Sequence, residues 1–426
     1  MSTGTPTQEK DRIAALDTLR GFALLGILLL NILGFGLLSS AYFNPQVGSE
    51  LSTALNLTIW GSVDVLFEGA MRGLFSMLFG AGVALFTEAA RGRTAALHYK
   101  RTLWLLIFGV IDGFLLLWNG DILIVYALAG FLLYPARNAS PTRLLIAAGV
   151  LLALMSGLYA VSNWGRGMAR EAAELVATNP EADAQTQEMA TAWQEFEAGF
   201  KQSPEAAAEE LEQRRGSYAS AFAWNLVTMT GQLLFVTPIY LFWDALMLML
   251  VGMALYRMGV LSGGQSSGFY TRLMVFGFVA GITINAYEVY RSVSSGFDPL
   301  VTFGYMQWTY HFGRTSMALG WLGLVMLACQ RGWWTSLQAR LGAVGRMALT
   351  NYLMHSVFAL VLFTGAGLGL VGVLQRYQLY LVVLAIWAFQ LWFSPWWLAR
   401  FRFGPVEWLW RWLTYGQKPA LRRQTS

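Results

Sequence analysis

Asp17, Arg20 and Asn31 lie in the apolar run LDTLRGFALLGILLLN at residues 16–31. A charged side chain inside hydrocarbon is costly, and it normally faces a partner or a water-filled cavity. In a helix, Asp17 and Arg20 are three residues apart and can touch. Arg20 and Asn31 are about three turns apart on one face, at a separation of about 16 Å. The run therefore predicts a polar cavity with Arg20 near one end and Asn31 past its middle.

A second apolar run, DVLFEGAMRGLFSMLFGAG at residues 64–82, carries polar residues at every fourth position, namely Asp64, Glu68, Arg72 and Ser76. On one helix this spacing forms a polar stripe. Small residues in the same run allow close helix contacts: Gly69, Gly73, Gly80 and Gly82. A Glu68–Arg72 pair would serve equally well as a structural ion pair or as part of a functional site, and both explanations stay open here.

Two aspartates occur in the run FGVIDGFLLLWNGDIL at residues 108–123. Asp112 falls near the middle of a helix without a local partner, so a carboxyl group there could act as an acid or a base. Asp121 follows Asn119 and Gly120 at an expected helix start. Capping of that helix is the simpler explanation for Asp121, and a role in binding an acceptor is the alternative.

Histidine is rare in the chain, which has only His98, His311 and His355. His311 and Arg314 are three apart in YHFGRTSMALG, and His355 lies four residues after Asn351 in GRMALTNYLMHS. For both histidines, packing and catalysis are open explanations. No pair of histidines has zinc-site spacing, and Cys329 is alone, so we expect no metal and no disulfide.

The composition identifies the solvent that surrounds these residues. The chain of 426 residues is 56% hydrophobic and 12% charged, about half the roughly 25% charged residues of soluble domains. Apolar runs of membrane-spanning length recur at 13–38, 62–88, 102–119, 121–135, 142–162, 238–257, 270–290, 308–329, 346–364 and 379–397. Because these runs are too long for barrel strands, they predict an all-α, polytopic transmembrane bundle of about ten helices.

Lys and Arg residues gather in alternate connections and in both terminal segments, whereas the short connections between them hold only Arg291 and Arg376. Basic residues favour the cytoplasmic side, so both termini are expected in the cytoplasm. This assignment requires residues 216–237 to form an interfacial or re-entrant helix. A full crossing there would invert all that follows.

Four regions are expected along the chain. Two five-helix halves, 1–162 and 238–397, flank an insert at 163–237, and a basic, Trp-rich tail follows at 398–426. Residues 163–217 hold five basic and eleven acidic residues, which suits either an outer helical cap or a solvated spacer. The tail is typical of an interfacial lipid anchor, so membrane lipids are expected partners and nucleic acid is not.

Five blocks together resemble the YeiB-like family of bacterial membrane proteins: LDTLRGFALLGILLLN, LFEGAMRGLFSMLFGAG, LLLWNGDILIVYALAG, GRMALTNYLMHS and FRFGPVEWLWRWLTY. The first block also resembles the opening helix of heparan-α-glucosaminide N-acetyltransferase and, more loosely, that of membrane O-acyltransferases that modify bacterial glycans. This resemblance implies a ten-helix core in a bacterial cytoplasmic (inner) membrane. It also implies transfer of an acyl group from cytoplasmic acyl-CoA, such as acetyl-CoA, to an acceptor sugar on the far side.

The chain departs from these families at the positions where they carry histidine. The glycan O-acyltransferases place a histidine at the position of Asn31, and YeiB-like relatives commonly have one at the position of Asp112. Conversely, those relatives often have glutamine where this chain has His355. If acyl transfer occurs, the base would be Asp112, Glu68 or His355, with Asn31 orienting the reacting carbonyl.

The expected site is one continuous polar passage across the membrane. Arg20, Asp17 and Arg346 would bind the phosphates of acyl-CoA at the inner mouth. A small-molecule or glycan acceptor would enter the outer mouth, near residues that include His311, Arg314, Arg72 and Asp121. Alternatives that stay open are a proton-coupled transporter or lipid flippase using Glu68 and Asp112, and a scaffold or sensor without turnover. The sequence also leaves open a homo-oligomer.

Overall fold

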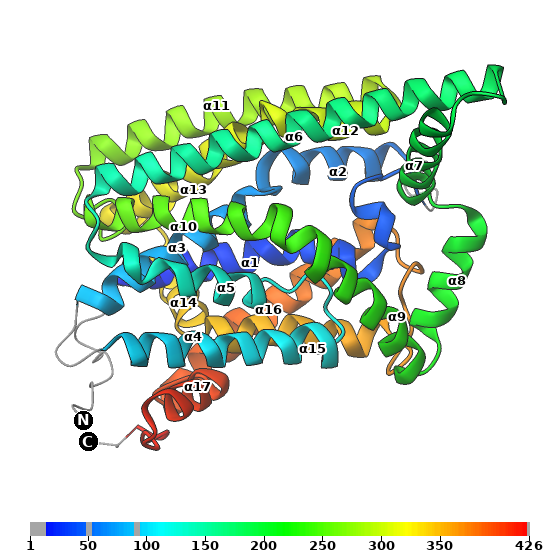
Figure 1. The fold of residues 1–426 in the computed structure, drawn as a ribbon. Helices are drawn as coiled ribbons and strands as arrows, with labels where there is room; N and C mark the ends of the chain where they lie inside the picture. Colours follow the sequence, from blue (N-terminus) through cyan, green and yellow to red (C-terminus); the bar gives the residue numbers. More distant parts are fainter. Residues whose placement is uncertain (1–13, 48–52, 89–93, 424–426) are drawn as a thin grey trace.

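The computed structural model describes residues 14–47, 53–88 and 94–423. Over these residues the chain is helical, and its single extended contact is an isolated bridge between Phe401 and Arg422. The helices pack alongside one another as a bundle (Figure 1). The predicted all-α helical bundle is therefore confirmed.

The helices follow the apolar runs of the sequence. In chain order they are α1 (Ala14–Gly36), α2 (Ala54–Phe67), α3 (Ala70–Glu88), α4 (Ala95–Val110), α5 (Leu123–Leu133), α6 (Pro141–Thr178), α7 (Ala184–Lys201), α8 (Pro204–Arg215), α9 (Tyr218–Gly231), α10 (Phe242–Arg257), α11 (Ser267–Ser294), α12 (Pro299–Gly304), α13 (Tyr310–Arg331), α14 (Thr335–Arg346), α15 (Ala348–Phe363), α16 (Arg376–Arg400) and α17 (Pro405–Tyr415). Short 3₁₀ turns are η2 (Ser39–Tyr42), η5 (Pro135–Asn138) and η7 (Tyr305–Gln307), and π-helical turns are η4 (Ile111–Leu115) and η6 (Gln232–Leu241).

Seven helical stretches in the described part of the chain are long and apolar enough to cross a membrane: Ala14–Gly36, Ala54–Thr87, Pro141–Thr178, Tyr218–Arg257, Ser267–Ser294, Tyr310–Arg331 and Arg376–Arg400. The bent pair α14 and α15, at 81°, would make an eighth. The protein is therefore an integral membrane protein. The expected crossings at 102–119 and 121–135 correspond to α4 with η4 and to the short α5, which are not among these stretches. A total of ten crossings stays a prediction.

The second polar run does not form one uninterrupted helix, as the sequence pattern suggested. α2 ends at Phe67 and α3 begins at Ala70, with Gly69 between them at φ +64°. A Cβ atom on Gly69 would lie 2.8 Å from Cδ of Arg314 and 2.9 Å from the Tyr310 hydroxyl. Close packing against α13 and a left-handed backbone at Gly69 therefore break the helix. Asp64 lies on α2, whereas Arg72 and Ser76 lie on α3.

Residues 216–237 are not a separate interfacial helix, which corrects the expectation. α9 runs through η6 into α10, so Tyr218–Arg257 is one continuous stretch. Pro238 lacks an N–H donor, and the wider turns of η6 carry the helix past it. Asn225 Nδ2 donates to the Gly113 carbonyl at 2.7 Å, which connects α9 to η4. The side of the membrane that holds the termini stays a prediction.

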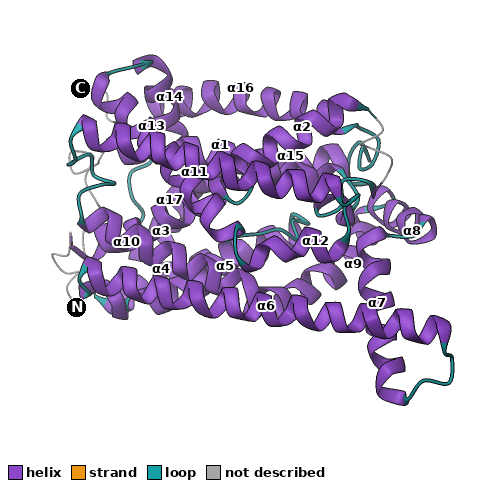
Figure 2. Ribbon diagram, turned by 90° about the horizontal axis from the view of Figure 1, so that it is seen from above, coloured by secondary structure: helices purple, strands orange, loops and turns teal. Residues whose placement is uncertain are grey.

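An outer arm is formed by α7 and α8, at the end of the bundle away from α17 (Figures 1 and 2). α6 is 38 residues long and runs without interruption through the expected boundary at residue 162. The boundary expected at residue 237 likewise falls inside η6. Neither boundary is therefore a break in secondary structure.

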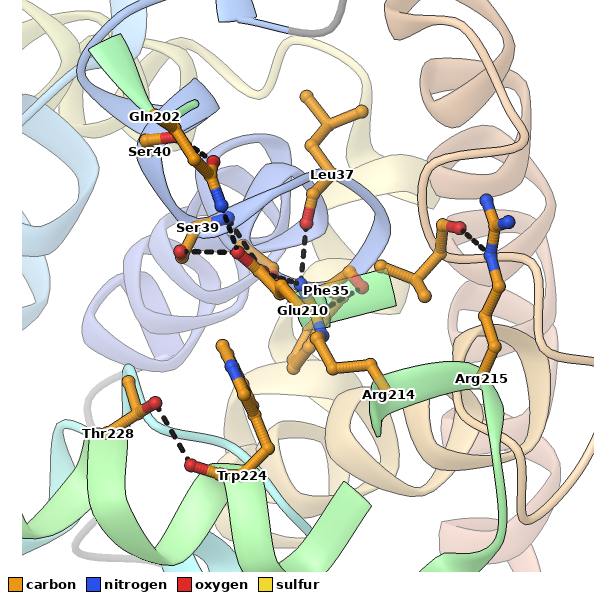
Figure 3. Close-up of polar contacts among 12 residues, drawn as sticks. Phe35, Leu37, Ser39, Ser40, Gln202, Glu210, Arg214, Arg215, Trp224 and Thr228 are labelled. Atoms are coloured by element: carbon orange, nitrogen blue, oxygen red, sulfur yellow. Dashed lines mark hydrogen bonds and ion pairs between the residues drawn. The ribbon is translucent and has the colours of Figure 1, made fainter. Parts of the chain in front are cut away.

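Two buried side chains of α8 fasten this arm to the end of α1 (Figure 3). Arg214 donates to the carbonyls of Leu37 at 2.7 Å, Phe35 at 2.9 Å and Gly34 at 3.1 Å. Arg214 also pairs with Glu210 at 2.8 Å, and Glu210 accepts from the backbone and hydroxyl of Ser39 at 2.9 and 2.8 Å. Because the last carbonyls of a helix lack intrahelical donors, Arg214 serves as a C-terminal cap for α1.

Candidate functional site

Two cavities of similar volume lie within the part of the bundle that the structure describes. The first, here the Arg20 cavity, has a volume of about 290 Å³, and its polar lining comprises Asp17, Arg20, His98, Arg101, Thr102, Tyr126, Arg346, Tyr352, Glu407, Arg411, Thr414 and Tyr415. The second, here the Glu68 cavity, has a volume of about 320 Å³, and its charged and tyrosine lining comprises Tyr42, Asp64, Glu68, Arg72, Tyr159, Arg166, Tyr240, Asp244, Tyr305, Tyr310, Arg314, Arg376 and Tyr380. The two cavities have no lining residue in common.

The first turns of α1 and the end of α14 form one wall of the Arg20 cavity. Arg20 Nη1 lies 2.7 Å from Asp17 Oδ1, as the three-residue spacing predicted. Gly345 makes this wall possible, because a Cβ there would lie 1.9 Å from the Asp17 carbonyl oxygen. Arg346 follows directly and lines the same cavity. The structure therefore brings together all three residues that were expected to bind an acyl-CoA donor.

The C-terminal helix α17 covers another side of the Arg20 cavity. Glu407 accepts from the backbone and hydroxyl of Thr350, at 2.9 and 2.5 Å. The Trp410 indole donates to the Arg101 carbonyl at 3.0 Å, and the Arg101 guanidinium lies 4.4 Å from the ring centroid. The sequence pattern of the tail predicts only lipid anchoring. The spacing of Glu407, Trp410, Arg411 and Thr414 places them on one face of a helix, and this pattern could have indicated that they line a cavity.

Glu68 occupies the Glu68 cavity between two tyrosines. Tyr42 and Tyr310 each donate a hydroxyl hydrogen bond to Glu68, both at 3.2 Å. Arg72 in turn donates to the Tyr310 hydroxyl at 3.0 Å. The expected Glu68–Arg72 pair is thus linked through Tyr310, whose hydroxyl receives from one residue and donates to the other.

A buried ion pair forms the wall of the Glu68 cavity next to α10. Arg314 donates from Nη1 to Asp244 Oδ2 at 2.8 Å and from Nη2 to Asp244 Oδ1. Arg314 Nη2 also lies 2.6 Å from His311 Nδ1. A guanidinium only donates, so Nδ1 accepts and the His311 proton resides on Nε2. Asp244 was not a candidate, although a lone aspartate in the apolar run at 238–257 was a readable signal.

One layer of side chains separates the two cavities. Tyr126 lines the Arg20 cavity and shares a hydrogen bond of 2.6 Å with the Ser76 hydroxyl. Tyr126 also donates to the Arg72 carbonyl at 3.2 Å, while the Arg72 side chain lines the Glu68 cavity. The expected single passage from Arg20 to His311 is therefore wrong for this structure, because α3 and Tyr126 interrupt it.

Five expected site residues line neither cavity, namely Asn31, Asp112, Asp121, His311 and His355. Asp121 Oδ2 accepts from the Ile124 amide at 2.8 Å, in keeping with a capping role. His355 Nε2 lies 3.1 Å from Gln390 Oε1, and His311 stacks on Tyr159 at 5.5 Å. The buried amide nitrogen of Asn31 has no hydrogen-bond partner. Within the described ranges, no three His, Cys, Asp or Glu side chains gather as a metal site.

The sequence is related to bacterial proteins over its whole length. Residues 255–417 match the family described as "Protein of unknown function (DUF418)". The chain is 32% identical to the "Uncharacterized protein YeiB" of Escherichia coli (strain K12), over 95% of this chain and 96% of that protein. It is also 32% identical to the "Uncharacterized protein YxaH" of Bacillus subtilis (strain 168), over the full length of both. No solved structure matches the chain. The protein therefore belongs to the YeiB-like family of bacterial membrane proteins.

Proposed function

We propose that the protein transfers an acyl group from acyl-CoA at the Arg20 cavity to a glycan or lipid acceptor at the Glu68 cavity. The observation that carries this proposal is the back-to-back position of two polar cavities, separated by the Tyr126–Ser76–Arg72 layer. A donor and an acceptor that approach from opposite ends of the bundle would meet at this layer. The same arrangement explains why charged residues are kept inside an apolar bundle.

The lining of the Arg20 cavity fits a polyanionic donor. Its arginines, Arg20, Arg101, Arg346 and Arg411, belong to α1, α4, α14 and α17. Arginine is suited to phosphate because its planar group can donate two parallel hydrogen bonds. A thioester bound there would supply the acyl group. The arginines would bind the phosphates of acyl-CoA, and its thioester end would lie against the Tyr126–Ser76–Arg72 layer.

Glu68 is the best placed of the three bases expected from the sequence, because it lines a cavity whereas Asp112 and His355 do not. Glu68 would accept the proton of the acceptor hydroxyl or amine as that atom forms a bond to the acyl carbon. The carbon–sulfur bond would break, and the proton would return to the thiolate. Tyr42 and Tyr310 would hold the Glu68 carboxylate in position through their hydroxyl groups.

We place the protein in the bacterial cytoplasmic membrane, with the Arg20 cavity facing the cytoplasm. The support for this side is the excess of Lys and Arg in the connections at the Arg20 end of the bundle. Acyl-CoA is a cytoplasmic compound, so this orientation also gives the donor access to its cavity. Labelling of single cysteines by membrane-impermeant reagents in whole cells would check it.

The test of function uses the purified full-length protein, radiolabelled acetyl-CoA, and lipid or glycan extracts. The expected result is transfer of label to a component of an extract, with one free CoA thiol released per label. Absence of both transfer and thiol release with every extract would contradict the proposal.

A carrier function, either proton-coupled transport or lipid flipping, is the alternative. It is favoured by the closed layer between the two cavities, which is also the arrangement of an occluded transporter. Substrate flux that depends on a proton gradient in proteoliposomes, without thiol release, would favour the carrier.

A further inference from the structure

Asp112 and Asp121 face each other at the join of α4 and α5. Asp112 is 0% exposed and Asp121 is 2% exposed. Gly109 lies one turn before Asp112, and a Cβ on Gly109 would lie 2.8 Å from Asp121 Oδ2. Asp121 and the Ser356 hydroxyl group are neighbours of the Asp112 carboxyl group. Two carboxyl groups are therefore in contact, away from both cavities.

The hydrogen bonds of the two carboxyl groups differ. Asp121 accepts from the Ile124 amide at 2.8 Å and from the Tyr352 hydroxyl at 3.4 Å. Neither oxygen of Asp112 accepts a hydrogen bond from a protein donor. Across the described ranges, no Lys, Arg or His forms an ion pair with either residue. An ionised Asp112 would therefore be a buried charge with one neutral hydroxyl group, that of Ser356, near it, without a cation and next to a second negative charge.

We propose that Asp112 and Asp121 together hold one proton, and that Tyr352 connects this proton site to the Arg20 cavity. Asp112 is the neutral acid and gives its hydrogen bond to Asp121. Asp121 is the carboxylate, because the Ile124 amide at the start of α5 and the Tyr352 hydroxyl donate to it. Two carboxyl groups can hydrogen-bond to each other only when one of them carries a proton.

Tyr352 is the member of this cluster that lines the Arg20 cavity. Its hydroxyl receives hydrogen bonds from the Trp118 indole at 3.2 Å and the Ile122 amide at 3.1 Å, which fix its position. When an acid in the cavity takes the place of the Trp118 indole or the Ile122 amide and protonates the Tyr352 oxygen, the phenolic proton passes to Asp121, and Tyr352 is left unchanged. The acid loses one proton and the pair gains one, so the charge of the pair changes from −1 to 0. The Asp112–Asp121 proton site does not depend on which ligand the Arg20 cavity binds.

Infrared spectroscopy of the full-length protein labelled with ¹³C-carboxyl aspartate tests the proton. At neutral pH, we expect a ¹³C-shifted band of a protonated aspartate that disappears in Asp112→Asn. The matched control is Asp64→Asn, which removes a carboxyl group at the other cavity and should keep that band. Loss of only carboxylate bands in Asp112→Asn would show that Asp112 is ionised, and would overturn the proposal.

Two further variants complete the test. Tyr352→Phe should keep the protonated band but slow its shift after transfer to D₂O, whereas Tyr380→Phe at the Glu68 cavity should leave the rate unchanged. An unchanged rate in Tyr352→Phe would overturn the connection to the cavity. If Asp112→Asn does not fold, Asp121→Asn still offers an acceptor to Ile124 and should move the Asp112 band. A band that does not move would then contradict the pair.

Discussion

The Tyr126 hydroxyl donates to the backbone carbonyl of Arg72, and the side chains of these two residues line different cavities. α3 is thus the partition between the cavities: its Phe75 faces the Arg20 cavity, whereas Arg72, one turn earlier, faces the other. Any chemistry that joins the cavities must pass this turn. Substitutions in the two linings can therefore separate the roles of the two sides.

Arg20→Ala should weaken binding of CoA to the purified protein. Loss of a charge-assisted contact with phosphate costs about 1–3 kcal/mol, which corresponds to roughly 5- to 150-fold in Kd. Isothermal titration calorimetry with CoA measures this change. Arg272→Ala is the control, because Arg272 is exposed at the start of α11 and lines neither cavity. Equal CoA affinities of Arg20→Ala and the unmodified protein would remove Arg20 from donor binding.

Glu68→Gln should lower the rate of acyl transfer by about 10²- to 10⁴-fold, as expected for loss of a general base. Gln has the same size and can still accept a hydrogen bond from one of Tyr42 and Tyr310, which donate to different oxygens of Glu68, so folding should be maintained. CoA affinity should also be unchanged, because Glu68 does not line the Arg20 cavity. Glu209→Gln on the exposed face of α8 is the matched control. A rate within a few-fold of the unmodified protein would exclude Glu68 as the base.

Much of the fold follows from hydropathy. Apolar runs of membrane length can be satisfied only by helices, so the all-α bundle and the positions of its main helices were predictable. Local spacing was also reliable over one turn, since Asp17 and Arg20 do form a pair. Periodicity failed where tertiary packing changed the backbone. The break at Gly69 depends on its close contact with Arg314, 245 residues later in the chain. The spacing of polar residues within one helix carries no information on such a contact.

The site was less predictable, because cavities depend on which faces of distant helices meet. The sequence places Arg20 and Arg346 in one site, because both are basic residues expected at the same end of the bundle. Tyr310, by contrast, links Glu68 to Arg72 from another helix, and the sequence gives no sign of this contact. The sequence indicates no local partner for Asp112 and a helix cap for Asp121, and nothing in the pattern connects the two residues. The proposed pairing with Asp112 leaves the capping bond of Asp121 in place.

Arg314→Met and Asp244→Leu should each destabilise the protein strongly, because each leaves a buried charge without its partner. The expected loss is about 3–5 kcal/mol for each single variant, with recovery of most of it in the double variant. Thermal unfolding in detergent, compared among the four proteins, measures the coupling. Lys201→Met is the control: it breaks an exposed pair with Glu197, and such pairs contribute about 0–1 kcal/mol. Additive losses in the double variant would show that the two side chains act independently.

The start of α7 in the outer arm should depend on pH. Thr186 donates its amide and hydroxyl to Asp183, at 3.0 and 2.9 Å, and these hydrogen bonds lower the pKa of Asp183. A lowered carboxyl pKa means that the cap contributes fully above the unfolded pKa and is lost as pH falls through the folded pKa. Protection of the Thr186 amide from hydrogen exchange, corrected for intrinsic rates, should therefore fall in acid. Asp183→Asn should abolish this dependence, and a persistent one would assign it elsewhere.

Arg214→Met should release the outer arm from α1. Arg214 is 7% exposed, and its loss leaves Glu210 without its cationic partner and the last carbonyls of α1 without their side-chain donor. Each unsatisfied buried group costs about 1–3 kcal/mol, so opening of the arm is favoured over keeping these groups buried. Hydrogen exchange at the amides of Ser39 and Gly365 should rise, because these amides donate to Glu210 and to the Arg214 carbonyl.

Release of the arm should also affect the Glu68 cavity. Phe196 and Phe200 of α7 pack against Phe303, which lines that cavity, at ring distances of 5.8 and 5.7 Å. Arg214→Met should therefore change the reactivity of a cysteine introduced at Phe303, while CoA affinity at the Arg20 cavity stays constant. Arg170→Met is the control, since Arg170 pairs with Glu174 and Asp298 while 41% exposed. If both variants changed exchange and reactivity equally, general loosening of the arm would explain the effect, and the cap on α1 would have no special role.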